Sequence, residues 1–261
     1  MDFYEKEPGV YVTEEQEDAP VVSGTSVGTT QVLAVTEWGP TEGYIEVDSF
    51  GLWKKIFGDY ISAAHPAWKQ VKKAFLNGAL RVQTKRVVHY TDPADASTCT
   101  AVKAAGTLTD GEATPAARVR VTAKYAGALD VKVVTSEASN GAAECFDLAI
   151  FVKGIKREVF ANLSEDISSD DYFMTRVNGK SYYVVLAEPA VANAKHVKAS
   201  QEVTLSGGND GLTGLVDADF LGDEVAGTGI HAFNTFGDTA VIICPEEDLQ
   251  TAKTLREGII L

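Results

Sequence analysis

The stretch Gln31-Val32-Leu33-Ala34-Val35-Thr36 decides the fold class of this chain. It is a continuous apolar run, and Trp38-Gly39-Pro40 ends it. A short apolar run bounded by turn residues is typical of a strand that is buried on both faces, whereas a half-exposed strand alternates apolar and polar residues. The sequence therefore predicts a fully buried strand at residues 31–36.

Two helices are predicted directly after this strand. The first carries its aromatic residues on one face of residues 50–57, and Asp48 or Ser49 can cap its N-terminus. The second follows Pro66, a residue that suits the first helical position, and Gly78 ends it. Apolar side chains recur three and four residues apart in both segments, so each helix has one apolar face.

Strands are predicted again at residues 80–88 and 239–244, and the second of these is the apolar run TAVIIC. Pro245 and the acidic residues after it are expected to open a last helix, because proline and acids favour a helix N-terminus. The order strand, helix, helix, strand predicts an α/β layer architecture. We assign it to one discontinuous domain, residues 21–92 and 202–261.

The pattern changes between these two segments. Over residues 93–201 the helical signals give way to short alternating runs, separated by turns such as Asn140-Gly141 and Asn178-Gly179. We expect residues 93–201 to be an inserted, mostly antiparallel β-rich domain. The Gly-rich stretch 206–214 lacks the ending of a P-loop and the ligand spacing of an EF-hand, so we interpret it as the structural hinge by which the chain returns.

Residues 1–20 have the composition of an extended N-terminal arm. Pro8 and Gly9 break the segment, Val10-Tyr11-Val12 is a short extended run, and residues 14–18 are acidic. So few apolar residues cannot offset the entropy of ordering the segment, unless something else pairs with it.

Charge and composition exclude several classes of protein. The chain has 261 residues, with 23 basic and 37 acidic side chains, so its formal net charge is −14. Such a charge disfavours binding to nucleic acid or to an anionic membrane surface. The cysteines Cys99, Cys145 and Cys244 are too widely spaced for a disulfide framework or a thiolate zinc site, which fits a reducing compartment. No apolar run has the roughly 18 residues that a membrane helix needs, and the N-terminus does not look like a signal peptide.

The search for catalytic and ligand-binding residues finds no site. The histidines His65, His89, His196 and His231 form no metal-binding motif. Gly24-Thr25-Ser26 invites comparison with the serine motif of subtilisin-type proteases, but the family's histidine motif is absent and the serine would come first in the triad order. We predict no catalytic residue, no metal and no cofactor, and expect that the chain is not an enzyme.

The chain resembles the contractile phage tail sheath proteins in the order of several short motifs. Near the N-terminus, Pro8-Gly9-Val10-Tyr11-Val12 followed by Glu14 resembles a signature of that family. The other matching segments, in chain order, are Gly39-Pro40, Val47-Asp48-Ser49-Phe50, Phe57-Gly58, Ala74-Phe75-Leu76-Asn77-Gly78, Tyr125-Ala126-Gly127, Phe160-Ala161-Asn162-Leu163-Ser164, Leu205-Ser206-Gly207-Gly208-Asn209-Asp210-Gly211 and Thr228-Gly229-Ile230. Each motif is short, but together they extend in order over nearly the whole chain.

The resemblance implies a fold and a function. It implies a subtilisin-like α/β sheath domain without protease chemistry, with the β-rich insertion on its outer surface. It implies a structural subunit that polymerises helically around the tail tube and contracts to drive the tube through the host envelope. Its partners would be other copies of itself, the tail tube protein, the baseplate and the tail terminator. Its location would be the virion tail, assembled in the host bacterial cytoplasm.

The resemblance also gives the arm a role. Sheath arms pair as strands with neighbouring subunits, so Pro8, Gly9, Val10, Tyr11 and Val12 are expected to form an intersubunit contact. Sheath proteins usually continue through a C-terminal domain that accepts these arms, whereas this sequence ends at Leu261. We therefore expect an incomplete sheath domain, and a chain that is monomeric by itself.

Two other functions stay open at this level. A subtilisin-like domain could be an active peptidase, and the β-rich insertion could be a surface-binding or carbohydrate-binding module. Labelling of a serine by a fluorophosphonate probe would favour the peptidase, and tubular polymers in electron micrographs would favour the sheath.

Overall fold

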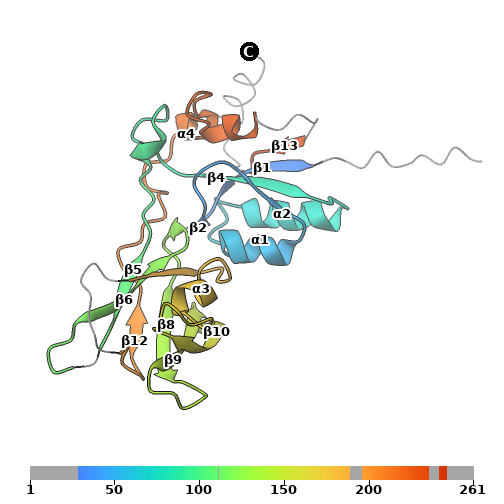
Figure 1. Ribbon diagram of the computed structural model, residues 1–261. Coiled ribbons are helices and arrows are strands. Elements are labelled where there is room, and N and C mark those ends of the chain that lie inside the picture. Colours follow the sequence, from blue (N-terminus) through green and yellow to red (C-terminus); the bar gives the residue numbers. More distant parts are fainter. Residues whose placement is uncertain (1–28, 111, 189–195, 235–240, 246–261) are drawn as a thin grey trace, which may run out of the picture.

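In the computed structural model, which describes residues 29–110, 112–188, 196–234 and 241–245, the predicted buried strand is β1 (Thr30–Val35) (Figure 1). All six of its residues are buried. It lies between two parallel neighbours, β4 (Val82–Val87) and β13 (Val241–Ile243). A fourth strand, β3 (Ile45–Val47), pairs antiparallel with β4 and completes the order β13-β1-β4-β3.

Helices cover both faces of this sheet. Val32 and Ala34 of β1 pack in one hydrophobic cluster with α1 (Phe50–Phe57) and α2 (Ala67–Leu76). The alternate residues Leu33 and Val35 pack on the other face, against the short helices α4 (Asp217–Leu221) and η2 (Gly229–Phe233). Figure 1 shows the resulting order of helix, sheet and helix. This confirms the predicted α/β class, and we call this part the upper lobe.

The boundaries of α1 and α2 follow the predicted punctuation. Ser49 Oγ accepts a hydrogen bond from the Leu52 amide at 3.4 Å, so Ser49 caps α1. Trp53 of α1 is fully buried, and its indole N–H donates to Thr84 Oγ1 of β4 at 3.0 Å. Pro66 stands directly before α2, as expected. The predicted helix after Pro245 lies outside the described residues.

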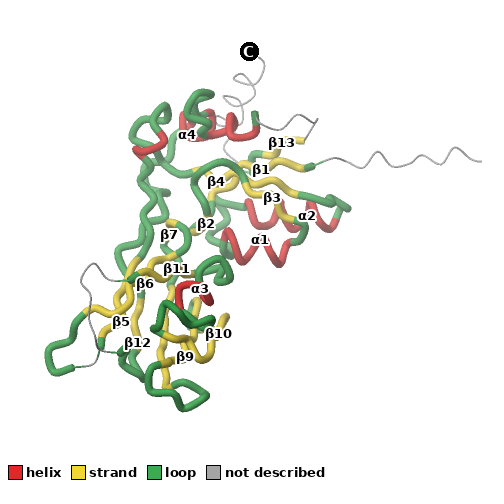
Figure 2. Tube along the Cα trace, in the orientation of Figure 1, coloured by secondary structure: helices red, strands yellow, loops and turns green. Residues whose placement is uncertain are grey.

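The strands of the middle segment form a second part, the lower lobe (Figure 2). One sheet has the order β10-β9-β8-β12 and the other the order β11-β6-β5, and all their described pairings are antiparallel. The strands are β5 (Ala105–Thr109), β6 (Ala117–Ala123), β8 (Val131–Glu137), β9 (Cys145–Val152), β10 (Ile155–Ser164), β11 (Val184–Ala187) and β12 (Glu202–Thr204). They share one large hydrophobic cluster with the short helix α3 (Phe173–Val177).

The turn at Asn178-Gly179 differs from the prediction. It does not join two strands, because Asn178 ends α3 with φ −66° and only Gly179 has a positive φ, 82°. The Asn178 side-chain amide instead pairs with the Leu186 backbone, donating to its carbonyl and accepting from its N–H at 2.8 Å each. The helix α3 escaped prediction because five residues are too short to display a helical period.

The return from the lower lobe comes later than expected. Residues 202–204, predicted to lie in the α/β domain, form β12 and pair with β8 of the lower lobe. Leu205 is buried in the lower-lobe cluster as well. At the other end, Pro93 still contacts the upper lobe, because its carbonyl accepts a hydrogen bond from Thr228 Oγ1 at 2.7 Å. The assignment of residues 93–201 to an inserted domain stays a prediction.

Candidate functional site at the interlobe junction

A two-residue strand pair joins the lobes. β2 (Trp38–Gly39) continues from β1 and pairs antiparallel with β7 (Ala126–Gly127). Trp38 is fully buried and belongs to the lower-lobe cluster, although it follows directly on a strand of the upper lobe. A Cβ on Gly127 would collide with the Glu37 carbonyl, so only glycine permits this approach of the two backbones.

Arg86 of β4 holds the junction together. Its guanidinium is fully buried and donates to carbonyls of three segments. The acceptors are Thr36 at 3.1 Å and Gly39 at 2.8 Å before and within β2, Ala126 of β7 at 2.6 Å, and Asp210 of the Gly-rich stretch at 2.7 Å. Burial lowers the pKa of Arg86 to about 10, and the carbonyl dipoles take the place of the lost hydration.

The Gly-rich stretch 206–214 packs against the same junction. Ser206 exchanges backbone hydrogen bonds with Ala105 at 2.9 and 3.0 Å. A Cβ on Gly208 would collide with the Gly127 carbonyl, so this glycine is required for close contact between backbones. Backbone groups of Ser206, Asn209, Asp210 and Gly211 are hydrogen-bonded within the protein, in agreement with the structural interpretation of the stretch.

One polar pair near the junction resembles part of a catalytic triad. His89 Nδ1 lies 3.0 Å from a carboxylate oxygen of Asp219, which is fully buried and also accepts from the Tyr90 and Val216 amides. In the described part of the chain, no serine, threonine or cysteine side chain hydrogen-bonds to the His89 ring. Asp219 therefore orients His89 and ties the backbone together, but the pair has no nucleophile there. Ser26 lies outside the described residues.

The other predicted absences concern metals and membranes. His65, His196 and His231 lie apart from one another, His196 near Glu165 at 3.7 Å and His231 near Asn234 at 3.3 Å. In residues 29–110, 112–188, 196–234 and 241–245, no group of three metal-ligating side chains is found. None of the helices described there has the length and apolarity that crossing a bilayer requires.

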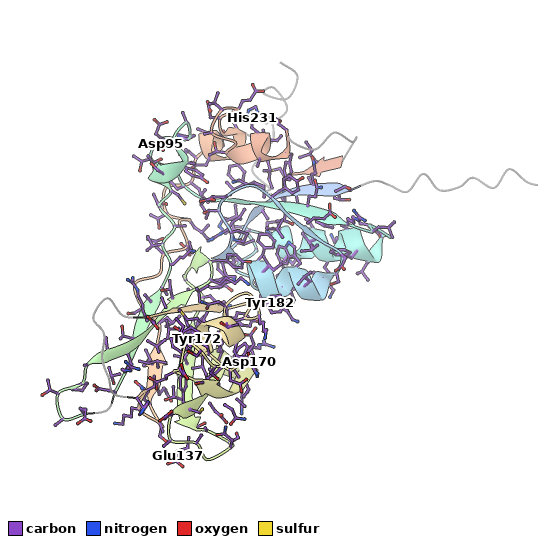
Figure 3. All side chains as sticks on the ribbon, in the orientation of Figure 1. Asp95, Glu137, Asp170, Tyr172, Tyr182 and His231 are labelled. Atoms are coloured by element: carbon purple, nitrogen blue, oxygen red, sulfur yellow. The ribbon has the colours of Figure 1, made fainter. Side chains whose placement is uncertain are left out.

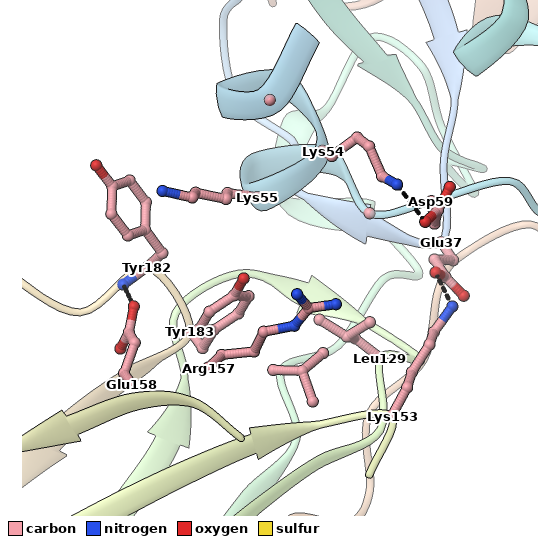
Figure 4. A pocket seen from close by; sticks show the side chains of 13 residues that line it. Glu37, Lys54, Lys55, Asp59, Leu129, Lys153, Arg157, Glu158, Tyr182 and Tyr183 are labelled. Atoms are coloured by element: carbon pink, nitrogen blue, oxygen red, sulfur yellow. Dashed lines mark hydrogen bonds and ion pairs between the residues drawn. The ribbon is translucent and has the colours of Figure 1, made fainter. Parts of the chain in front are cut away.

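A cleft of about 500 Å³ opens beside the junction, between α1 and the lower lobe (Figure 4). Two ion pairs line it: Lys54–Asp59 at 2.6 Å within the upper lobe, and Lys153–Glu37 at 2.5 Å between the lobes. Tyr182 of the lower lobe faces α1, as Figures 3 and 4 show. The cleft is the candidate binding site of the described chain.

Sequence reasoning placed its site elsewhere. The predicted arm residues Pro8, Gly9, Val10, Tyr11 and Val12 lie outside the described residues, so the arm stays a prediction. Arg86 and the cleft residues were missed. One available signal was the pair Lys85-Arg86 inside a predicted strand, because charges in a strand that becomes buried require partners.

Comparison with known proteins identifies the fold. No protein-family model and no curated protein sequence matches the chain. Among solved structures, the sheath tail protein of Listeria innocua matches with a TM-score of 0.56 and 19% identity, over 89% of this chain and 44% of that one. The sheath tail protein of Desulfitobacterium hafniense matches with a TM-score of 0.55 and 18% identity, over 96% of this chain and 48% of that one.

These matches confirm the predicted resemblance at the level of fold: the chain is sheath-like over most of its length. It spans less than half the length of either solved structure.

Proposed function

We propose that this chain is a structural subunit of a contractile tail sheath, which polymerises helically around a tail tube and contracts to drive the tube through a host envelope. The observation that carries the proposal is the fold, which is similar to sheath tail proteins over 89% and 96% of the chain. The order of short motifs along the sequence supports it independently. Its partners would be other copies, the tube protein, the baseplate and the terminator, in a virion tail assembled in the host bacterial cytoplasm.

The same resemblance supports two finer statements about the fold. The upper lobe would be a subtilisin-like sheath domain, and the lower lobe an inserted domain on the outer surface of the sheath. The sheet order β13-β1-β4-β3, with helices on both faces, is compatible with such a domain.

The mechanical task fits the construction of the junction. A sheath works by many repeated, symmetric contacts that switch between two packings, and each subunit has to transmit force without deforming. The β2–β7 pair, the Arg86 hydrogen bonds and the Lys153–Glu37 ion pair all connect the two lobes at the junction. These contacts favour movement of the two lobes as one body.

Immunogold labelling tests the proposal directly. Antibodies against this chain are applied to contractile particles purified from the organism that encodes it, before and after contraction. Repeated label along the tail shaft, with a closer axial spacing after contraction, supports the proposal. Label confined to the baseplate, or absent from the particle, contradicts it.

The peptidase alternative has its own test. A peptidase would be labelled by a fluorophosphonate probe, and the label would be lost in the S26A variant. We expect no label, because His89–Asp219 has no nucleophile in the described residues and the triad order of subtilisin-type proteases is absent from the sequence.

A further inference from the structure

The interlobe cleft carries an excess of positive charge on a strongly acidic chain. Its lining includes the cations Lys54, Lys55, Lys153 and Arg157 and the carboxylates Glu37, Asp59 and Glu158, while the whole chain has a net charge of −14. Two of the carboxylates are already paired with lysines, so the cations left unpaired decide which ligands the cleft attracts, because charges of one sign in a cleft concentrate ligands of the opposite sign. The local sign therefore points to an anionic occupant.

Two of these cations have no carboxylate partner among the described residues. Lys54 and Lys153 are held in ion pairs with Asp59 and Glu37, whereas among the described residues neither Lys55 nor Arg157 forms an ion pair. Glu158 is turned to its own lobe, where it accepts hydrogen bonds from Ser181 Oγ at 2.7 Å and the Tyr182 amide at 2.9 Å.

The two unpaired cations face the cleft from opposite lobes. Lys55 Nζ of α1 lies over the Tyr182 ring, 4.9 Å from its centroid. Arg157 comes from β10, and Figure 4 shows its guanidinium between Tyr183 and Leu129, in the middle of the cleft. Burial raises the pKa of Tyr183, and the nearby Arg157 charge opposes that rise. An anionic segment lying in the cleft would contact both lobes at once.

The chain itself contains a segment of the matching chemistry. Residues 14–18 read Glu-Glu-Gln-Glu-Asp, with four carboxylates in five positions. In an extended chain, side chains two residues apart point to the same side. Neighbouring side chains point to opposite sides, so in an extended bound segment the adjacent carboxylates Glu14 and Glu15 would face the two lobes from which Lys55 and Arg157 come. A volume of about 500 Å³ lies within the range of sites that enclose a few side chains.

We propose that the interlobe cleft binds the acidic segment 14–18 of a second copy of the chain. The inference rests on the proposed function, in which copies of the chain stack against one another. β1 runs towards the cleft: Thr36 and Glu37 follow it, and Glu37 lines the cleft. The chain therefore enters β1 at the end remote from its own cleft, about 20 Å away for a six-residue strand. The eleven residues between Asp18 and Thr30 can span that distance, so the stacking of copies is what favours a second chain, and the isotope composition of the links below distinguishes the two cases.

The contact is weak for a single pair of chains. Exposed ion pairs contribute little individually, and the negative charge of each copy opposes their approach. The docking is therefore transient in dilute solution, and it becomes persistent where many copies are held side by side.

Zero-length cross-linking on the full chain tests the inference. Natural-abundance and ¹⁵N-labelled chains are mixed in equal amounts at high concentration and treated with a carbodiimide, which joins a carboxylate to an amine in contact with it. Peptides that link residues 14–18 to Lys54, Lys55 or Lys153 are located by mass spectrometry. The Lys153–Glu37 pair, at 2.5 Å, is the internal positive control and links within one chain.

We expect isotopically mixed links between segment 14–18 and the cleft lysines. Links to Lys54 and Lys153, the amines that both variants keep, should fall about five- to thirtyfold in the K55Q/R157Q variant, the combined effect of two exposed charge contacts. The K72Q/K73Q variant is the matched control: it removes two exposed charges from α2, and Lys72 also lies over an aromatic ring, that of Trp68, at 5.6 Å. It should leave the links unchanged.

Three results would overturn the inference. The first is that all links have a single isotope composition, which would place each chain's own segment in its own cleft. The second is that no link between segment 14–18 and the cleft forms although the Lys153–Glu37 link does. The third is that both variants lose these links equally. The outcome is separate from that of the proposed function. If mixed links form but antibodies against the chain never label tail shafts, only the proposed sheath function is contradicted. If the shafts are labelled but no such links form, only the proposed binding of segment 14–18 in the cleft is contradicted.

Discussion

Replacing Arg86 by methionine removes the hydrogen bonds that connect three backbone segments at the interlobe junction. Methionine has a similar length and fills much of the same volume, so the cavity left behind is small. The carbonyls of Thr36, Gly39, Ala126 and Asp210 each lose a charged donor. Leaving a buried polar group without its partner costs about 1–3 kcal/mol.

The expected loss is about 3–5 kcal/mol of the free energy of unfolding. It is smaller than the sum over all the acceptors, because the cost of burying a guanidinium disappears with it. A domain is stable by only about 5–15 kcal/mol, so the R86M variant should unfold at clearly lower urea concentration. Because Arg86 couples the lobes, we also expect tryptophan fluorescence and far-UV circular dichroism to give separate midpoints in the variant.

Arg81 supplies the matched control. It stands just before β4, but its side chain is 65% exposed and its ion pair with Glu46, at 3.2 Å, lies at the surface. R81M should therefore change the free energy of unfolding by about 1 kcal/mol or less. If R86M were within about 1 kcal/mol of wild type, or no less stable than R81M, the junction would not depend on the Arg86 hydrogen bonds.

Three further predictions concern stability and assembly. Burial lowers the pKa of Lys85 to about 8, so between pH 8 and about 10 the unfolded chain binds more protons than the folded one and stability should rise with pH. Urea titrations at several pH values measure this, and a rise as steep in the K85M variant would contradict it. The G127A substitution should destabilise the chain by about 2 kcal/mol or more, because the added Cβ would collide with the Glu37 carbonyl. The control G154A has open space around the added Cβ, so it should cost only the backbone strain of about 1 kcal/mol. Equal melting temperatures for the two variants would refute the steric argument. The chain alone should scatter light as a monomer in dilute solution, since the contact proposed for segment 14–18 is weak and the −14 of each copy opposes association, more strongly at low ionic strength; stable rings or tubes from the dilute chain would contradict this.

The main elements of the upper lobe could be derived from local sequence, whereas the short elements β3, α4 and η2 were not predicted. The apolar run of β1, the cap at Ser49 and the proline before α2 act within a few residues, so the sequence near them suffices to predict them. The alternating runs of the lower lobe likewise predicted antiparallel strands, with β9 alternating between buried and half-buried residues along its length. In these segments hydrophobic periodicity and local hydrogen bonds agree with the final packing.

The sites were decided by tertiary structure. Nothing near Arg86 in the sequence indicates that the carbonyls of Ala126 and Asp210 will surround it, because those acceptors are brought there by the return of the chain. The same holds for the cleft, where Lys55 and Arg157 belong to different lobes and meet only after both have folded. Periodicity determines which side chains are buried, but the partners of a buried or converging charge depend on backbone segments far apart in sequence. The sequence by itself therefore determined the longer strands and the helices α1 and α2, and the packing of the two lobes determined which polar groups meet.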